Sequence, residues 1–178
     1  MSEKKELYGK AKEEMRLSER ILAELPGFRG YKEKELRRET DRLIRNHLYR
    51  KLTDARSDLK NVFQKLSKQR RYEVLTDMDH LVMKFDRVAE KINHASYGYT
   101  GFFNVVKVGE GKLDKMIEFD SQLINHVQKI VDETADFKKE TAEKKFEKAG
   151  EHIEKLDGSL DSLEKTFSER GEVILGVK

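Results

Sequence analysis

The sequence of 178 residues contains no cysteine and no tryptophan, and it contains a single proline. Without cysteine, the chain cannot form a disulfide bond, a cysteine-ligated zinc site, an iron–sulfur cluster or a thiol nucleophile. Long hydrophobic runs are also missing, since no stretch approaches the roughly 18 consecutive apolar residues of a membrane-spanning helix. Residues 1–6 carry mixed charges in place of an apolar signal segment. We therefore expect a cytoplasmic protein with no transmembrane segment.

Charged residues make up 40% of the chain and hydrophobic residues 37%. The hydrophobic residues recur at every third or fourth position, which is the spacing of one helix face, and this periodicity argues against disorder. The pattern predicts an all-α fold: an elongated antiparallel bundle of about five helices, with coiled-coil-like seams and no sheet. The chain length is most simply that of a single domain over residues 1–178.

The N-terminal half divides at the proline and at a lapse in the apolar repeat. A first helix is predicted at residues 3–25, because Pro26 then ends it. A long second helix is predicted at residues 31–68 and a third at residues 73–96, with a turn or kink between them. The seam of the long helix consists of Leu48, Leu52, Ala55, Leu59, Val62 and Leu66.

The C-terminal half, residues 112–170, holds a fourth and a fifth helix. Residues 134–141 lie at their junction and contain no glycine or proline, so a hairpin and one continuous bent helix remain alternatives. Gly171 is expected to end the fifth helix, which leaves residues 173–178 as a short apolar tail.

Residues 97–111 form a connector that is rich in glycine and aromatic residues. Its aromatic side chains present large apolar surfaces, which are unfavourable in water unless another surface covers them. One interpretation is that they cap the end of the bundle, and the other is that they bind a partner protein. The candidate partner-binding residues are Tyr97, Tyr99, Phe102 and Phe103.

A basic stripe is predicted along the long second helix. Residues 26–72 hold fifteen basic and six acidic side chains, whereas residues 112–178 hold twelve and sixteen. At 100° per residue the stripe falls within an arc of about 60°. Its members, the candidate anion-binding residues, are Arg38, Arg42, Arg45, Tyr49, Arg56 and Lys60. The stripe either contacts a polyanion or pairs with the acidic C-terminal helices.

Asp120 interrupts the apolar seam of the fourth helix. A carboxylate at such a position needs water or a cationic partner, and we expect an arginine of the long second helix to supply it.

The sequence indicates no catalytic, cofactor-binding or metal-binding residues. His80 and His94 share a helix face but are about 21 Å apart along it, and His126 and His152 have no evident acidic cluster at a suitable spacing. The sequence contains no nucleotide-binding glycine pattern and no nucleophile motif. These observations indicate neither a small-molecule substrate nor an enzyme.

The favoured hypothesis is a non-enzymatic structural or interaction protein. It would present charged helical faces and the aromatic connector to protein partners or to other copies of the chain. The alternative is binding of nucleic acid or an anionic surface through the basic stripe.

Overall fold

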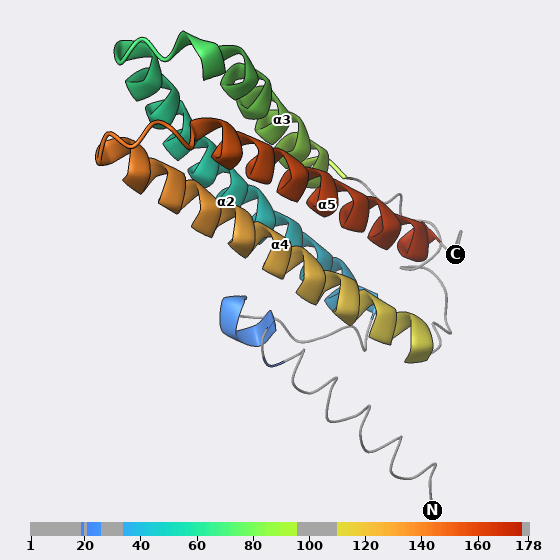
Figure 1. The fold of residues 1–178 in the computed structure, drawn as a ribbon. Coiled ribbons are helices and arrows are strands. Elements are labelled where there is room, and N and C mark those ends of the chain that lie inside the picture. Colours follow the sequence, from blue (N-terminus) through green and yellow to red (C-terminus); the bar gives the residue numbers. More distant parts are fainter. Residues whose placement is uncertain (1–18, 20, 26–33, 96–109, 176–178) are drawn as a thin grey trace, which may run out of the picture. The chain divides into compact units, whose positions relative to one another are not determined.

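The computed structural model describes residues 19, 21–25, 34–95 and 110–175, with side chains described for 19, 21–25, 39–95 and 114–174. These residues form α2 (Lys34–Lys68), the short 3-10 helix η1 (Tyr72–Val74), α3 (Leu75–Asn93), α4 (Glu110–Ala142) and α5 (Ala149–Leu175) (Figure 1). The described residues contain no strand, so the predicted all-α bundle is confirmed. Most of the predicted first helix lies outside the described residues.

The described residues divide into two compact units. Unit 1 comprises the described parts of 1–45, 96–124 and 166–178, and unit 2 comprises 46–95 and 125–165. Because α2, α4 and α5 are each continuous across a unit boundary, each of these helices contributes one segment to each unit.

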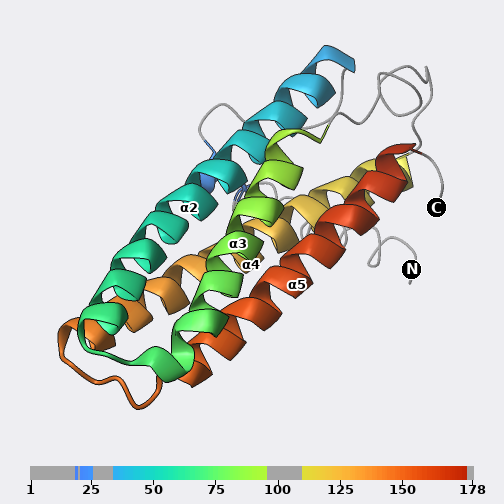
Figure 2. The same cartoon turned by 90° about the horizontal axis from the view of Figure 1, so that it is seen from above.

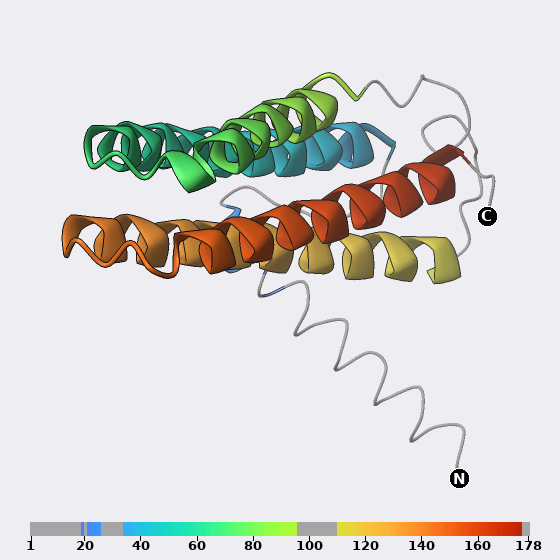
Figure 3. The ribbon, with the colours of Figure 1, turned by 45° about the horizontal axis from the view of Figure 1, so that its top comes forward.

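Unit 2 is built from two antiparallel helical hairpins. Residues 69–74 join α2 to α3, and residues 143–148 join α4 to α5 (Figure 2). The two hairpins of unit 2 lie one over the other as two layers (Figure 3). The predicted seam of α2 is confirmed, since all six of its residues are buried. The neighbouring helix α3 carries its own buried seam, composed of Met78, Leu81, Phe85, Val88 and Ile92.

Polar contacts between side chains join neighbouring helices all around unit 2. They show the order of the helices around the bundle to be α2, α3, α5 and α4. These contacts are Arg56–Asp86 (α2 with α3), Lys84–Asp157 (α3 with α5), His152–Glu133 (α5 with α4) and Lys138–Asp58 (α4 with α2).

The two hairpin turns use the same backbone motif. Arg70 and Lys144 both have positive φ angles, 58° and 60°. The amide of Arg71 donates to the carbonyl of Leu66, and the amide of Lys145 donates to the carbonyl of Glu140. This pattern, in which a left-handed residue allows the next amide to cap the last helical turn, is the Schellman motif.

Two predicted boundaries are wrong. The break expected at residues 134–141 lies at 143–148, and α4 continues through the predicted region to Ala142. The fourth and fifth helices are therefore not continuous. Gly171 does not end the last helix, because α5 runs to Leu175 and buries Val173 and Ile174. Burial of these two apolar side chains favours the extra helical turn.

Candidate functional site

The predicted basic stripe is largely occupied by contacts within the chain. Nε of Arg45 lies 2.9 Å from Oδ2 of Asp41, and Arg56 forms an ion pair with Asp86. The hydroxyl of Tyr49 donates a 3.2 Å hydrogen bond to Oε1 of Glu90. Of the members whose side chains are described, only Arg42 and Lys60 are exposed, and the side chain of Arg38 lies outside the described ones.

These partners differ from the acidic C-terminal helices that the sequence suggested. Asp41 belongs to α2 itself and Asp86 belongs to α3. Among the described ion pairs, the acidic face of α5 is met by α3. Glu164 accepts hydrogen bonds from Arg87 at 2.8 Å and from Lys91 at 2.9 Å.

The pKa values of the α3–α5 pairs follow from these contacts. Burial alone would raise the pKa of the Glu164 carboxyl, but the hydrogen bonds from Arg87 and Lys91 outweigh it and lower that pKa. Burial likewise opposes the charge of Lys84, yet Asp157 and Asp161 raise its pKa. Each contact therefore favours the charged forms of both partners.

The candidate partner-binding residues Tyr97, Tyr99, Phe102 and Phe103 lie outside the described residues. Their role stays a prediction.

Unit 1 contains a buried network of charged side chains from three helices. Nε of Arg170 in α5 donates to Oδ1 of Asp120 in α4 at 2.6 Å, and a terminal nitrogen of Arg170 donates to Oδ1 of Asp41 in α2 at 2.7 Å. Arg170 and Asp120 are completely buried. Arg45 contacts the second oxygen of Asp41, so these four side chains comprise two cations and two anions.

The partner predicted for Asp120 is therefore half right. It is an arginine, as expected, but it comes from α5 and not from the long second helix. That helix contributes another carboxylate, Asp41, to the same cluster.

Unit 2 contains a second polar cluster around His152, whose exposed fraction is 6%. Nδ1 of its ring lies 2.6 Å from Oε1 of Glu133, and Nε2 lies 3.2 Å from Oε2 of Glu140. The ring also stacks on Phe137, with 4.8 Å between ring centroids. The two ring nitrogens of His152 thus face one carboxylate each, which joins α5 to two positions on α4.

The cluster lines an open pocket of about 300 Å³ in unit 2. Asp136, Lys139 and Lys155 are among the other side chains around it. The hydrogen bond with His152, helped by the charges of His152, Lys148 and Lys145, lowers the pKa of Glu140. The pocket thus combines the His152 ring with a mixed set of charged side chains.

The two glutamates that contact His152 were not anticipated from the sequence. Glu133, Phe137 and Glu140 are spaced by four and three residues, so α4 presents them on one face. That spacing was a readable signal, but the position of His152 against this face depends on the hairpin turn, which the sequence did not reveal.

Two further findings concern the described part of the chain. No three histidine, aspartate or glutamate side chains there are placed to hold a metal ion together. None of the described helices combines the length and the hydropathy needed to traverse a bilayer.

The described residues define an all-α protein. Its helices pack as hairpins and are joined by clusters of charged side chains. Comparisons with protein-family models, with curated proteins and with solved structures give no match to this chain.

Proposed function

We propose that this chain is a non-enzymatic interaction protein of the cytoplasm, which binds protein partners or further copies of itself. In this proposal the helices form a scaffold, and the contact surfaces are its charged outer faces and the aromatic connector at residues 97–111.

The observation that carries the proposal is that the charged side chains of the two clusters pair with one another. Arg170, Asp41 and Asp120 bond to one another, and His152 holds Glu133 and Glu140. A general acid, base or nucleophile must be free to contact a substrate. These groups are instead engaged in contacts between helices, which supports a structural role for them and leaves recognition to other parts of the surface.

The connector is the preferred contact segment on sequence grounds. Its four aromatic residues alternate in part with Gly98 and Gly101 and carry large apolar surfaces. Aromatic side chains are also enriched where protein interfaces gain most of their binding energy.

The basic stripe is the second candidate surface, and the exposure of Arg42 and Lys60 is what favours it. Its remaining described members have partners within the chain. Reversing the charges of Arg42 and Lys60 is expected to abolish salt-sensitive polyanion binding if this surface is used.

Site-specific photocrosslinking in cells tests the main proposal. A photoreactive residue is placed at Tyr99 or Phe102, and in a control at Lys129, which is exposed on α4. The expected result is a crosslinked adduct of defined mass from the connector positions only, identified by mass spectrometry as another protein or a second copy.

A second experiment places the photoreactive residue at a neighbouring connector position that is not substituted. The yield of the crosslinked adduct should fall in the double variant Tyr99→Ser/Phe102→Ser and should not fall in Lys129→Ser. Thermal unfolding followed by circular dichroism checks that both variants keep the fold. Equal crosslinking from all positions, or none from the connector, would contradict the proposal.

A further inference from the structure

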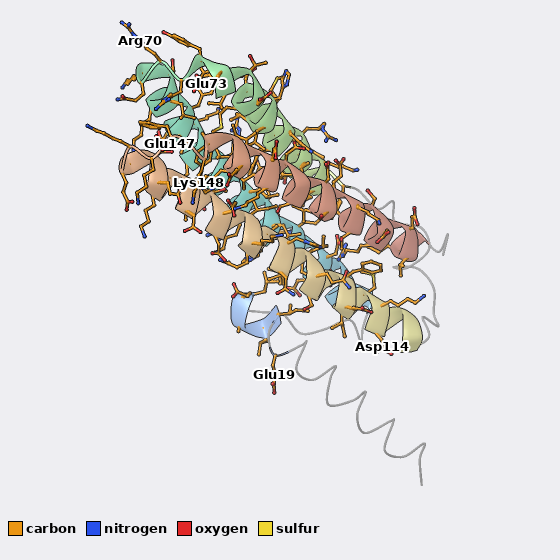
Figure 4. All side chains as sticks on the ribbon, in the orientation of Figure 1. Glu19, Arg70, Glu73, Asp114, Glu147 and Lys148 are labelled. Carbon is orange, nitrogen blue, oxygen red and sulfur yellow. The ribbon has the colours of Figure 1, made fainter. Side chains whose placement is uncertain are left out.

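The two hairpin turns of unit 2 lie at the same end of that unit. The guanidinium carbon of Arg71, in the first turn, is 5.3 Å from the ring centroid of Phe146 in the second turn. Figure 4 shows Arg70, Glu73, Glu147 and Lys148 gathered at this end. Residues that are about 75 positions apart in the chain therefore share one surface, which we call the turn end.

The turn end is strongly basic. Residues 60–73 contain five basic and one acidic side chain, and residues 143–148 contain three basic and two acidic side chains. Several of these cations are exposed and form no salt bridge with any described residue. They are Lys60, Lys65, Lys68, Arg70, Lys144 and Lys148.

Compensation of helix dipoles explains only part of this charge. Lys65 and Lys68 lie in the last turn of α2, where a cation interacts favourably with the exposed carbonyls. Arg70 and Lys144 lie beyond the helices, at the left-handed position where glycine is the usual residue. Both turns thus carry a long cationic side chain at a position where a residue without a β-carbon, glycine, is favoured.

An exposed aromatic ring lies beside these cations. Tyr72 follows Arg70 and Arg71 directly, and 65% of its surface is exposed. Cationic side chains that contact phosphates, together with an aromatic ring that stacks on a base, are the combination used to bind single-stranded nucleic acids. An acidic peptide would use the cations but would gain little from the ring.

We propose that the turn end binds a single-stranded nucleic acid. The lysines and Arg70 contact its phosphates, and Tyr72 stacks on one of its bases. This surface contains no residue of the connector and shares only Lys60 with the predicted stripe, so the inference stands without the function proposed above.

Fluorescence anisotropy with a labelled single-stranded oligonucleotide of mixed sequence tests the inference on the full chain. Binding should weaken steeply as the salt concentration rises. The triple variant Lys65→Glu/Lys68→Glu/Arg70→Glu should lose at least about tenfold in affinity, because it reverses three proposed phosphate contacts. Tyr72→Ser should lose about fivefold or more, because a stacked base contributes at least that much.

A second triple variant provides the matched control. Lys115→Glu/Lys129→Glu/Lys165→Glu changes the net charge by the same amount at exposed residues away from the turns, and it should keep most of the affinity. Equal losses in the two triple variants would overturn the inference, since they would indicate a general effect of net charge.

Two further measurements keep the result decisive. If the glutamate variant does not fold, Lys65→Gln/Lys68→Gln/Arg70→Gln replaces it, with an expected loss of about threefold or more. Polyglutamate at equal charge concentration should compete poorly with the oligonucleotide. Effective competition combined with an unchanged affinity of Tyr72→Ser would identify an acidic protein segment as the partner and overturn the nucleic-acid inference.

Discussion

Nε of Arg170 donates a 2.6 Å hydrogen bond to Oδ1 of Asp120, and neither side chain is exposed to solvent. The same guanidinium reaches Asp41, so a single arginine joins segments of α2, α4 and α5 within unit 1. Removing one member of a buried charge cluster leaves the remaining charges less well compensated in a medium that solvates them poorly.

The first prediction follows from this pairing. Asp120→Ala should lower the free energy of unfolding by about 3 to 5 kcal/mol, because it leaves part of the Arg170 charge buried without a partner. The double variant Asp120→Leu/Arg170→Met should lose less than Asp120→Ala alone, although it changes more atoms. Urea denaturation of each variant measures these differences.

The exposed ion pair Glu143–Lys145 is the control for the buried cluster. Glu143→Ala should leave the urea midpoint unchanged, because water solvates both groups once they separate. If Asp120→Ala were equally harmless, the buried cluster would contribute nothing to the stability of unit 1.

The second prediction concerns the pKa of Glu140. The hydrogen bond from His152 is the largest cause that lowers this pKa. In His152→Phe the bond is lost and the aromatic stack on Phe137 is kept, so the pKa of Glu140 should rise. Titration of the Glu140 carboxyl carbon by NMR measures the change.

Glu143 serves as the matched control, because its pKa is lowered mainly by the hydrogen bond with Lys145. It should titrate alike in the wild type and in His152→Phe. A Glu140 pKa that did not move would show that the contact with His152 does not form in solution.

The third prediction concerns the stability of unit 2 in acid. The folded state lowers the pKa of Glu164 below its ordinary value of 4.5 through Arg87 and Lys91. The associated stability is therefore fully present above that ordinary value and is lost as the pH falls through the lowered pKa. Glu164→Gln should show a smaller decrease in the free energy of unfolding between neutral pH and acid than the wild type shows.

Guanidinium denaturation at the two pH values provides the measurement. Glu151→Gln, on the exposed surface of α5, should keep the full wild-type decrease. An identical decrease in Glu164→Gln would mean that Arg87 and Lys91 do not stabilise the charged carboxylate.

The seams of the helices were predictable because they depend on local periodicity. Leu52 and Leu59 lie seven residues apart on one face, and any partner helix buries both. The need of Asp120 for a cationic partner or water was predictable for the same reason, since it occupies a seam position.

The identity of each polar partner was not predictable in this way. Arg170 is fifty residues from Asp120 in the chain, and their pairing depends on the geometry of the α4–α5 hairpin. That hairpin was misplaced because its turn carries Lys144 at the left-handed position, where glycine would have marked the end of the helix.

The fourth prediction uses these two turns. Arg70→Gly and Lys144→Gly should each raise the free energy of unfolding by about 0.5 to 1 kcal/mol. Glycine adopts a positive φ without the clash that a β-carbon causes, and this gain exceeds its larger loss of entropy on folding. Gln69→Gly and Glu143→Gly change the preceding residue of each turn and should destabilise instead. Thermal and urea unfolding distinguish these outcomes.

The stabilised variants also separate stability from binding at the turn end. Arg70→Gly removes a proposed phosphate contact while it relaxes the backbone, so its oligonucleotide affinity should fall as its melting temperature rises. A purely structural role for Arg70 predicts that affinity stays constant while stability rises. A lower affinity together with a higher melting temperature in Arg70→Gly would show that the charge of Arg70 serves binding at the expense of stability.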